Sequence, residues 1–224
     1  MSAQPRLVKV RENVLKQNDL VARELRQRFH EAGVCVVSLV SSPGSGKTAL
    51  LEKTLALLRP NYRVAALVGD LETENDAIRL ARAQVPVKQI TTGTLCHLEA
   101  AMVRGAIEGW VLNQLDLLFI ENVGNLVCPS SYDVGEDLRV VLLSVTEGED
   151  KPLKYPTIFN TSDLAVLTKM DLAEAVEFDL AAVERNVQRV RPGMRLLKVS
   201  SKNGEGMVEW LQLLAALKMN APQR

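Results

Sequence analysis

The 224-residue sequence has little of several features that mark particular classes of protein. Its three cysteines are too few, and odd in number, for a disulfide framework. Its 27 basic and 27 acidic residues cancel to zero net charge, which argues against nucleic-acid binding mainly through phosphate neutralisation. The longest apolar runs, such as residues 34–40, are far too short to cross a bilayer, and residues 1–11 lack the apolar core of a signal peptide. We therefore expect a cytoplasmic protein with neither nucleic acid nor membrane as a partner.

Beyond the first thirty residues, short apolar stretches alternate with stretches of helical periodicity. We expect strands at residues 34–40, 64–68, 87–90, 115–120, 140–143, 164–167 and 196–199, and helices at 49–58, 76–83, 98–112, 179–190 and 207–217. Apolar strands separated by helix-length segments are typical of a parallel sheet covered on both faces. The sequence thus predicts an α/β protein with a mostly parallel sheet over residues 33–224. Residues 1–32 are expected to form an N-terminal helical extension that stops at Gly33.

A phosphate-binding motif directly follows the first expected strand. The segment SSPGSGKT at residues 41–48 matches the pattern GxxxxGK[ST], except that Ser41 replaces the first glycine. Glycines let such a loop turn its N–H groups toward phosphate oxygens, the lysine reaches the β- and γ-phosphates, and the threonine hydroxyl ligates Mg²⁺. An ordinary Gly/Ser turn is the alternative, but the position between strand and helix favours nucleotide binding. The predicted phosphate-binding residues are Gly44, Ser45, Gly46, Lys47, Thr48 and Ala49.

Acidic residues follow two further expected strands. Asp70 ends the second strand and can hold Mg²⁺ together with Thr48. Glu121 follows the strand at residues 115–120 and can engage the same metal, and the N–H of Gly124 can approach the γ-phosphate. The sequence therefore predicts a P-loop nucleotide hydrolase whose catalytic residues are Lys47, Thr48, Asp70, Glu121 and Gly124.

The later part of the chain contains two elements of guanine recognition. The segment TKMD at residues 168–171 is similar to the NKxD motif, in which the lysine stem covers the base and the aspartate accepts its hydrogen bonds. Thr168 stands where that motif has asparagine. Residues 200–202, which follow the last strand, are similar to the SAK loop that backs the guanine. Lys169, Asp171, Ser201 and Lys202 are therefore the predicted base-binding residues, and they favour GTP over ATP.

The few cysteines and histidines include a candidate metal site. Cys96 and His97 are adjacent at the start of an expected helix, and Cys128 lies in the segment VGNLVCP. Thiolates and imidazole suit Zn²⁺ or Ni²⁺, but three ligands leave a tetrahedral site open for water, a fourth group or a second subunit. On spacing alone, two buried cysteines and a helix-capping histidine are an alternative interpretation. Cys35 belongs to the first apolar strand, and His30 is expected to be solvated or paired with the end of the leading helix.

Three segments together resemble the HypB family. They are ENVGNLVCP at residues 121–129, TTGTLCHLE at 91–99 and DKPLKYP at 150–156, and the resemblance extends from about Arg6 to the C-terminal helix. HypB proteins are GTPases that assist nickel insertion into [NiFe]-hydrogenase. The related urease GTPases of the UreG family carry their metal ligands as a Cys-Pro-His triplet, which this sequence lacks. The resemblance implies that Cys96, His97 and Cys128 form the metal site.

The resemblance further implies a GTP-hydrolysing metallochaperone that uses Mg²⁺ and binds Ni²⁺ or Zn²⁺. Its implied partners are a second copy in a GTP-promoted homodimer, a HypA-type nickel accessory protein and the hydrogenase large-subunit precursor. The sequence lacks the cysteine-rich and histidine-rich N-terminal tracts of some members, so no storage role is expected. Cys128 shares its loop with Glu121, whereas Cys96 and His97 do not, so we expect one nucleotide-responsive metal ligand and two stationary ones. The alternatives are a nucleotide-regulated scaffold with structural cysteines and a kinase-like enzyme for a small molecule.

Overall fold

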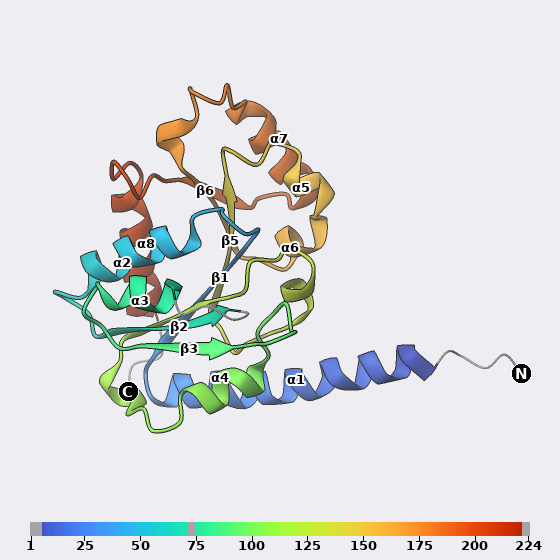
Figure 1. Ribbon diagram of the computed structural model, residues 1–224, viewed down its shortest axis with the longest axis vertical. Coiled ribbons are helices and arrows are strands. Elements are labelled where there is room, and N and C mark those ends of the chain that lie inside the picture. The colour runs from blue at the N-terminus through green and yellow to red at the C-terminus, as the bar shows by residue number, and fades with distance from the viewer. Residues whose placement is uncertain (1–5, 71–74, 221–224) are drawn as a thin grey trace, which may run out of the picture.

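The computed structural model describes residues 6–70 and 75–220, which form one parallel sheet flanked by helices (Figure 1). The strands are β1 (Cys35–Ser41), β2 (Val64–Asp70), β3 (Val87–Thr91), β4 (Leu117–Glu121), β5 (Leu138–Ser144), β6 (Leu164–Thr168) and β7 (Arg195–Lys198). The helices are α1 (Arg6–Glu31), α2 (Lys47–Leu58), α3 (Asn75–Ala81), α4 (Ala100–Ala106), α5 (Lys151–Lys154), α6 (Pro156–Asn160), α7 (Leu180–Val190) and α8 (Met207–Asn220). Short 3₁₀ turns cover Leu112–Gln114, Cys128–Ser131 and Met170–Leu172.

The sheet confirms the predicted fold class. Its strand order is β3-β2-β4-β1-β5-β6-β7, and every neighbouring pair is parallel. Each strand falls on a predicted apolar stretch. Because the strands are parallel, the carboxyl ends of β1, β2, β4 and β6 all lie at one edge of the sheet, where α/β proteins bind their ligands. The motifs predicted to bind nucleotide therefore converge on one edge.

The two faces of the sheet are covered by different helices. Successive side chains of a strand point to opposite faces, so Val37 and Leu39 of β1 pack with α2 and α8, whereas Val36 packs with α1 and α4. Helices α6 and α7 cover β5 and β6 on the same face as α1, since Val40 of β1, which points to the same face as Val36, packs with them. The five inner strands, β2, β4, β1, β5 and β6, are therefore buried on both sides, which explains their nearly continuous apolar sequence, whereas the edge strands β3 and β7 keep exposed polar residues.

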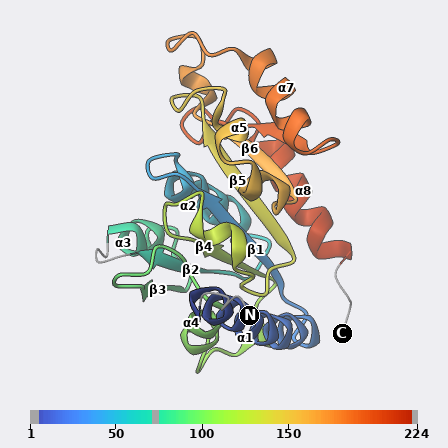
Figure 2. The same cartoon turned by 90° about the vertical axis from the view of Figure 1, so that its right-hand side faces the viewer.

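Helix α1 is joined to the body of the protein by apolar and polar contacts. Ala22, Leu25 and Phe29 are fully buried in the core that it shares with α4, and both views show α1 and α4 side by side (Figures 1 and 2). Arg26 donates from one guanidinium nitrogen to both carboxylate oxygens of Asp133, at 2.7 and 2.8 Å. The predicted stop is confirmed, since α1 ends at Glu31 and Gly33, two residues on, adopts a φ of 67°.

One predicted helix is wrong in length. The sequence indicated a helix at residues 98–112, but α4 covers only Ala100–Ala106. Gly109 has a φ of 81°, a left-handed conformation that a continuing helix cannot include. The helix also begins at Ala100 and not at residue 98, so Cys96 and His97 lie in the loop before α4 and not at its first turn. Within the described residues, none of the helices combines the length and the apolarity that a membrane span requires.

Candidate nucleotide and metal site

The phosphate loop has the conformation that its glycines predict. Gly44 and Gly46 have φ values of 73° and 92°, a left-handed region that favours glycine, and α2 begins at Lys47. The Lys47 ammonium donates to Ser41 Oγ at 2.9 Å and to the Ser42 carbonyl oxygen at 3.5 Å, so it lies across the mouth of the loop. Burial lowers the pKa of Lys47, while the Glu121 carboxylate opposes that shift. The loop therefore presents a buried cation and the first turn of a long helix.

The Glu121 carboxylate lies beside this loop and is incompletely hydrogen-bonded. Thr48 Oγ1 donates to Glu121 Oε1 at 2.7 Å, but Glu121 Oε2 is buried without a hydrogen bond. Burial raises the pKa of Glu121 to about 7, against the opposing effects of Lys47 and Thr48. An orphaned carboxylate oxygen next to a threonine hydroxyl is a donor set that fits Mg²⁺. Asp70, at the carboxyl end of the neighbouring strand, lines the same cavity.

Gly124 lies very close to the phosphate loop. A Cβ added at this residue would lie 2.9 Å from Pro43 Cα and 3.0 Å from Pro43 N, a distance that side chains do not tolerate. The loop that follows β4 is therefore pressed against the phosphate loop at a position where only glycine fits. Any side chain at residue 124 would push the two loops apart.

The guanine motif is hydrogen-bonded directly to the phosphate loop. Thr168 Oγ1 donates to the carbonyl oxygen of Ser45 at 2.5 Å, and Lys169 Nζ donates to that of Gly44 at 2.7 Å. Lys169 itself has a φ of 58°, which turns the chain at the end of β6. Thr168 thus joins β6 to the phosphate loop, although it stands in the position of the expected asparagine.

Asp171 is held by the loop after β7. Ser200 Oγ donates to Asp171 Oδ1 at 2.5 Å, and Lys202 Nζ lies 3.7 Å from Asp171 Oδ2. The sequence placed residues 200–202 in this loop but named only Ser201 and Lys202 as base-binding residues, whereas the hydroxyl that contacts Asp171 belongs to Ser200. Ser200 is fully buried, and its position directly after the last strand is the signal that pointed to it.

A cavity of about 530 Å³ lies between the phosphate loop, the ends of β2 and β4 and Lys169, whereas the predicted residues Ser45, Asp171, Ser201 and Lys202 are not among those that line it. The predicted residues Gly44, Gly46, Lys47, Thr48, Ala49, Asp70, Glu121, Gly124 and Lys169 line it. Asp76 and Arg79 of α3 also line it, and the sequence interpretation missed both. Arg79 Nε donates to Glu52 Oε2 of α2 at 2.6 Å. Asp76 and Arg79 are three residues apart, a spacing that places two charges on one side of a helix, and this is the signal that could have indicated them.

The three predicted metal ligands come together. Cys96 Sγ and Cys128 Sγ are 2.6 Å apart, and His97 Nδ1 is 4.0 Å from Cys96 Sγ. One ligand atom from each residue lies within 4.8 Å of the others, in a set that can hold a metal ion. Cys128 begins the short turn after the Glu121 loop, 32 residues from Cys96 in the chain. Two thiolates and an imidazole suit a borderline divalent ion.

His97 is positioned by its neighbours. The residue is 7% exposed, and its ring lies 3.9 Å from the ring of Tyr132, centre to centre. Its Nε2 is 3.5 Å from a carboxylate oxygen of Glu99, while Nδ1 faces the thiol of Cys96. Burial lowers the pKa of His97, which favours the neutral ring that metal ligation needs. A carboxylate behind the distal nitrogen is the usual support for a metal-binding histidine.

Cys35 and His30 lie outside this cluster. Cys35 is buried in β1, and burial raises the pKa of its thiol to about 11, so it is a structural residue as expected. His30 corrects the sequence interpretation, because it is neither freely solvated nor paired with its own helix end. Its Nε2 lies 2.6 Å from Asp137 Oδ1, at the entrance to β5.

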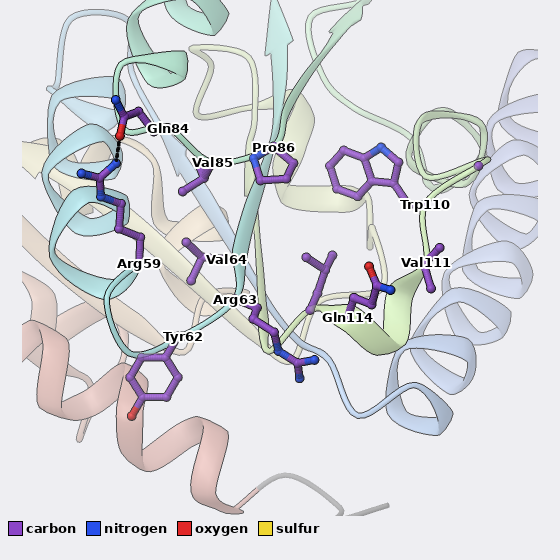
Figure 3. Close-up of a pocket in the computed structure, with 12 residues that line it drawn as sticks. Arg59, Tyr62, Arg63, Val64, Gln84, Val85, Pro86, Trp110, Val111 and Gln114 are labelled. Atoms are coloured by element: carbon purple, nitrogen blue, oxygen red, sulfur yellow. Dashed lines mark hydrogen bonds between the residues drawn. The ribbon is translucent and has the colours of Figure 1, made fainter.

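A second cavity, of about 500 Å³, lies at the amino ends of β2, β3 and β4 (Figure 3). Tyr62, Pro86 and Trp110 line it together with two arginines. The arginines already have partners, since Arg59 donates to Gln84 and Arg63 donates to Asp116. This cavity is at the other end of the strands from the phosphate loop and takes no part in the site above.

The fold and the phosphate loop define a P-loop nucleotide-binding protein. Residues 35–198 match the family model "CobW/HypB/UreG, nucleotide-binding domain". The chain is 49% identical to the hydrogenase maturation factor HypB of Azotobacter chroococcum mcd 1 over 211 residues, 93% of this chain and 68% of that protein. The chain therefore belongs to the CobW/HypB/UreG family and, within it, to the HypB hydrogenase maturation factors, which confirms the resemblance stated from the sequence.

Solved structures agree with this assignment. The crystal structure of HypB from Helicobacter pylori in complex with nickel is similar with a TM-score of 0.86 and 41% identity, over 93% of this chain and 98% of that one. HypB from Archaeoglobus fulgidus is similar with a TM-score of 0.84 and 36% identity, over 91% of this chain and 99% of that one.

Proposed function

We propose that the protein hydrolyses GTP and uses the nucleotide cycle to bind nickel and deliver it to [NiFe]-hydrogenase. One observation carries the proposal: the loop at residues 121–128 contains both a carboxylate of the nucleotide cavity and a cysteine of the metal cluster. A change in nucleotide that moves this loop therefore also acts on the metal site. The nickel complex of the similar Helicobacter pylori protein supports nickel as the cargo.

Hydrolysis is assigned to the residues at the carboxyl edge of the sheet. Lys47 neutralises the terminal phosphates, and Thr48, Asp70 and Glu121 hold Mg²⁺ directly or through water. Bound Mg²⁺ supplies positive charge to the β- and γ-phosphates. Gly124 contributes its N–H to the γ-phosphate, because its close approach to Pro43 keeps the two loops together.

Base recognition is assigned to the loops after β6 and β7. Asp171 accepts hydrogen bonds from guanine, Lys169 covers the ring with its alkyl stem, and Ser201 and Lys202 back the base. The hydrogen bond from Ser200 orients the Asp171 carboxylate. This arrangement supports GTP over ATP, since adenine lacks the two donors that a carboxylate accepts.

Nickel is held by Cys96, His97 and Cys128, and Zn²⁺ can occupy the same ligands. Three ligands leave one coordination position open, and a second subunit fills it across a two-fold interface. Because the loop that carries Cys128 also responds to the nucleotide, GTP favours this homodimer. A HypA-type accessory protein and the hydrogenase large-subunit precursor are the partners of delivery. Residues 1–32 act as a helical extension of the GTPase domain at residues 33–224, and the protein works in the cytoplasm.

Phosphate release without an acceptor tests the enzymatic part. The protein is incubated with Mg²⁺ and either GTP or ATP, and inorganic phosphate is measured over time. We expect slow release from GTP, little from ATP, and a loss in Thr48→Ala. A kinase-like enzyme would instead need an added acceptor, and equal rates with both nucleotides would contradict the base assignment.

Nickel titration tests the metal part. We expect about one nickel ion per chain or fewer, with a different affinity in the GDP form and in the form with a non-hydrolysable GTP analogue. Cys96→Ala should lose nickel and keep GDP, whereas the matched control Cys35→Ala should keep both because Cys35 lies in β1. Equal nickel affinity and equal oligomeric state in both nucleotide forms would refute the coupling.

A further inference from the structure

The segment that carries Cys96 and His97, here called the metal arm (residues 92–98), is fastened to the nucleotide side of the sheet. It connects β3 to α4. At its start, the Thr92 N–H donates to the main-chain oxygen of Asp70 at 2.9 Å, and the Thr92 hydroxyl donates to the same oxygen at 3.3 Å. Asp70 ends β2 and lines the nucleotide cavity. The first attachment of the metal arm is therefore a residue of that cavity.

The other end of the metal arm is bound by Asn122. The Leu98 N–H donates to Asn122 Oδ1 at 3.0 Å, and the same oxygen accepts from the N–H of Val123 at 2.9 Å. Asn122 is 3% exposed, and its own N–H donates to the Leu39 carbonyl of β1. One buried amide oxygen thus joins the metal arm to the first residue after Glu121.

Packing reinforces this attachment. Leu98 is fully buried, and its side chain fills the space beside Gly69, where an added Cβ would lie 2.7 Å from Leu98 Cγ. Gly69 directly precedes Asp70. The metal arm therefore packs against the ends of β2 and β4, the two strands that carry Asp70 and Glu121 of the nucleotide cavity.

We propose that Asn122 is a positioning residue that transmits the nucleotide state to the metal arm, an inference that rests on the proposed function. When Glu121 turns to engage Mg²⁺ and nucleotide, the adjoining Asn122 amide carries the Leu98 N–H with it, and His97 and Cys96 move relative to Cys128. Both parts of the metal cluster then respond to nucleotide. This two-sided coupling differs from the expectation drawn from the sequence, in which Cys96 and His97 are stationary and only Cys128 responds.

Asn18 of α1 provides a matched comparison. Its Oδ1 accepts from the N–H of Ala100 at 2.8 Å, and its Nδ2 donates to the carbonyl oxygen of Asp133 at 2.8 Å. Like Asn122, it is a buried asparagine, but it holds the first residue of α4, two positions beyond the metal arm. None of the described residues of α1 lines the nucleotide cavity. Asn18 therefore supports the cluster without a link to the nucleotide.

The test measures Ni²⁺ affinity of the full chain by nickel–thiolate absorption, in the GDP form and with a non-hydrolysable GTP analogue. We expect wild-type affinities that differ by a factor of about 5 to 150, the usual range of allosteric coupling. Asn122→Ala should reduce that factor to below about 2, while Asn122→Asp, which keeps an acceptor oxygen for both N–H groups, should restore most of it. Asn18→Ala should lower nickel affinity equally in both forms and leave the factor unchanged.

The possible results separate this inference from the proposed function. If the wild-type nickel affinities are equal in both nucleotide forms, the proposed coupling is wrong, and so is the role of Asn122. If Asn122→Ala binds GDP normally and keeps the wild-type difference in nickel affinity, only the role of Asn122 is wrong. If Asn122→Ala does not fold, Asn122→Asp provides the test. This variant keeps the acceptor oxygen, so a loss of coupling in it would refute the role of the hydrogen bond.

Discussion

Replacement of Glu121 by glutamine tests whether its carboxylate is kept in the fold for a cation. Glu121 is 2% exposed, and one of its oxygens has no hydrogen-bond partner. A charged group in such surroundings is destabilising unless something else compensates for its lost hydration. At neutral pH, the ionised Glu121 carboxylate should therefore destabilise the folded protein when neither nucleotide nor metal is bound.

The size of the effect follows from the pKa of Glu121. The pKa rises from an ordinary 4.5 to about 7 in the folded protein. Because the folded state binds the proton more tightly than the unfolded chain, stability is lost as the pH increases from about 4.5 to about 7. At about 1.4 kcal/mol for each pKa unit, the ionised carboxylate costs the folded state on the order of 3 kcal/mol at pH 8 and about 1 kcal/mol at pH 5.

Urea unfolding at pH 5, 6, 7 and 8, in a chelator and without nucleotide, measures this difference. Glutamine has the same shape and cannot ionise, so Glu121→Gln should be more stable than wild type by an amount that grows with pH. The control Glu205→Gln removes a carboxylate from the exposed loop before α8 and should show no such trend. A stability difference that is constant from pH 5 to pH 8, or that shrinks, would refute the reasoning about Glu121.

Three further changes probe the nucleotide and metal sites. Asp171→Asn should weaken GTP binding by about 1–3 kcal/mol and improve relative binding of xanthosine triphosphate, and unchanged guanine selectivity in competition assays would remove Asp171 from the base pocket. Gly124→Ala should cost about 1–3 kcal/mol in binding of a fluorescent GDP analogue, because its Cβ would lie 2.9 Å from Pro43 Cα; Gly105→Ala, which meets no atom within 4 Å, is its control. Dialysis against Ni²⁺ should leave about one ion per chain or fewer, and several tightly bound ions would contradict a three-ligand site.

The phosphate loop illustrates what the sequence could predict about the site. Its eight residues are contiguous, and their conformation depends on glycine φ values and on the junction between one strand and one helix. Such features are set by near neighbours in the chain, so Gly44, Gly46 and Lys47 adopt the expected positions. The parallel sheet was predictable for a related reason, because strands buried on both faces are apolar throughout.

The order of the strands and the contacts between distant loops could not be predicted in the same way. Thr168 donates a hydrogen bond to Ser45, 123 residues away, and the spacing of neither motif indicates it. Arg79 was missed because a charged residue on a short helix resembles any solvated surface. The end of α4 was misplaced because a helical pattern continues past Gly109, whose left-handed conformation stops the helix.

The sequence by itself determined the class of fold, the phosphate loop and which residues are chemically suited to bind a metal, since these depend on local pattern and on side-chain chemistry. Only the tertiary structure decided that Cys96 and Cys128 meet, and that Asn122 and Asp70 hold the metal arm against the nucleotide cavity. Those contacts join residues that are tens of positions apart in the chain. They exist because β3, β2 and β4 are successive neighbours in a parallel sheet, which brings the carboxyl ends of these strands to one edge.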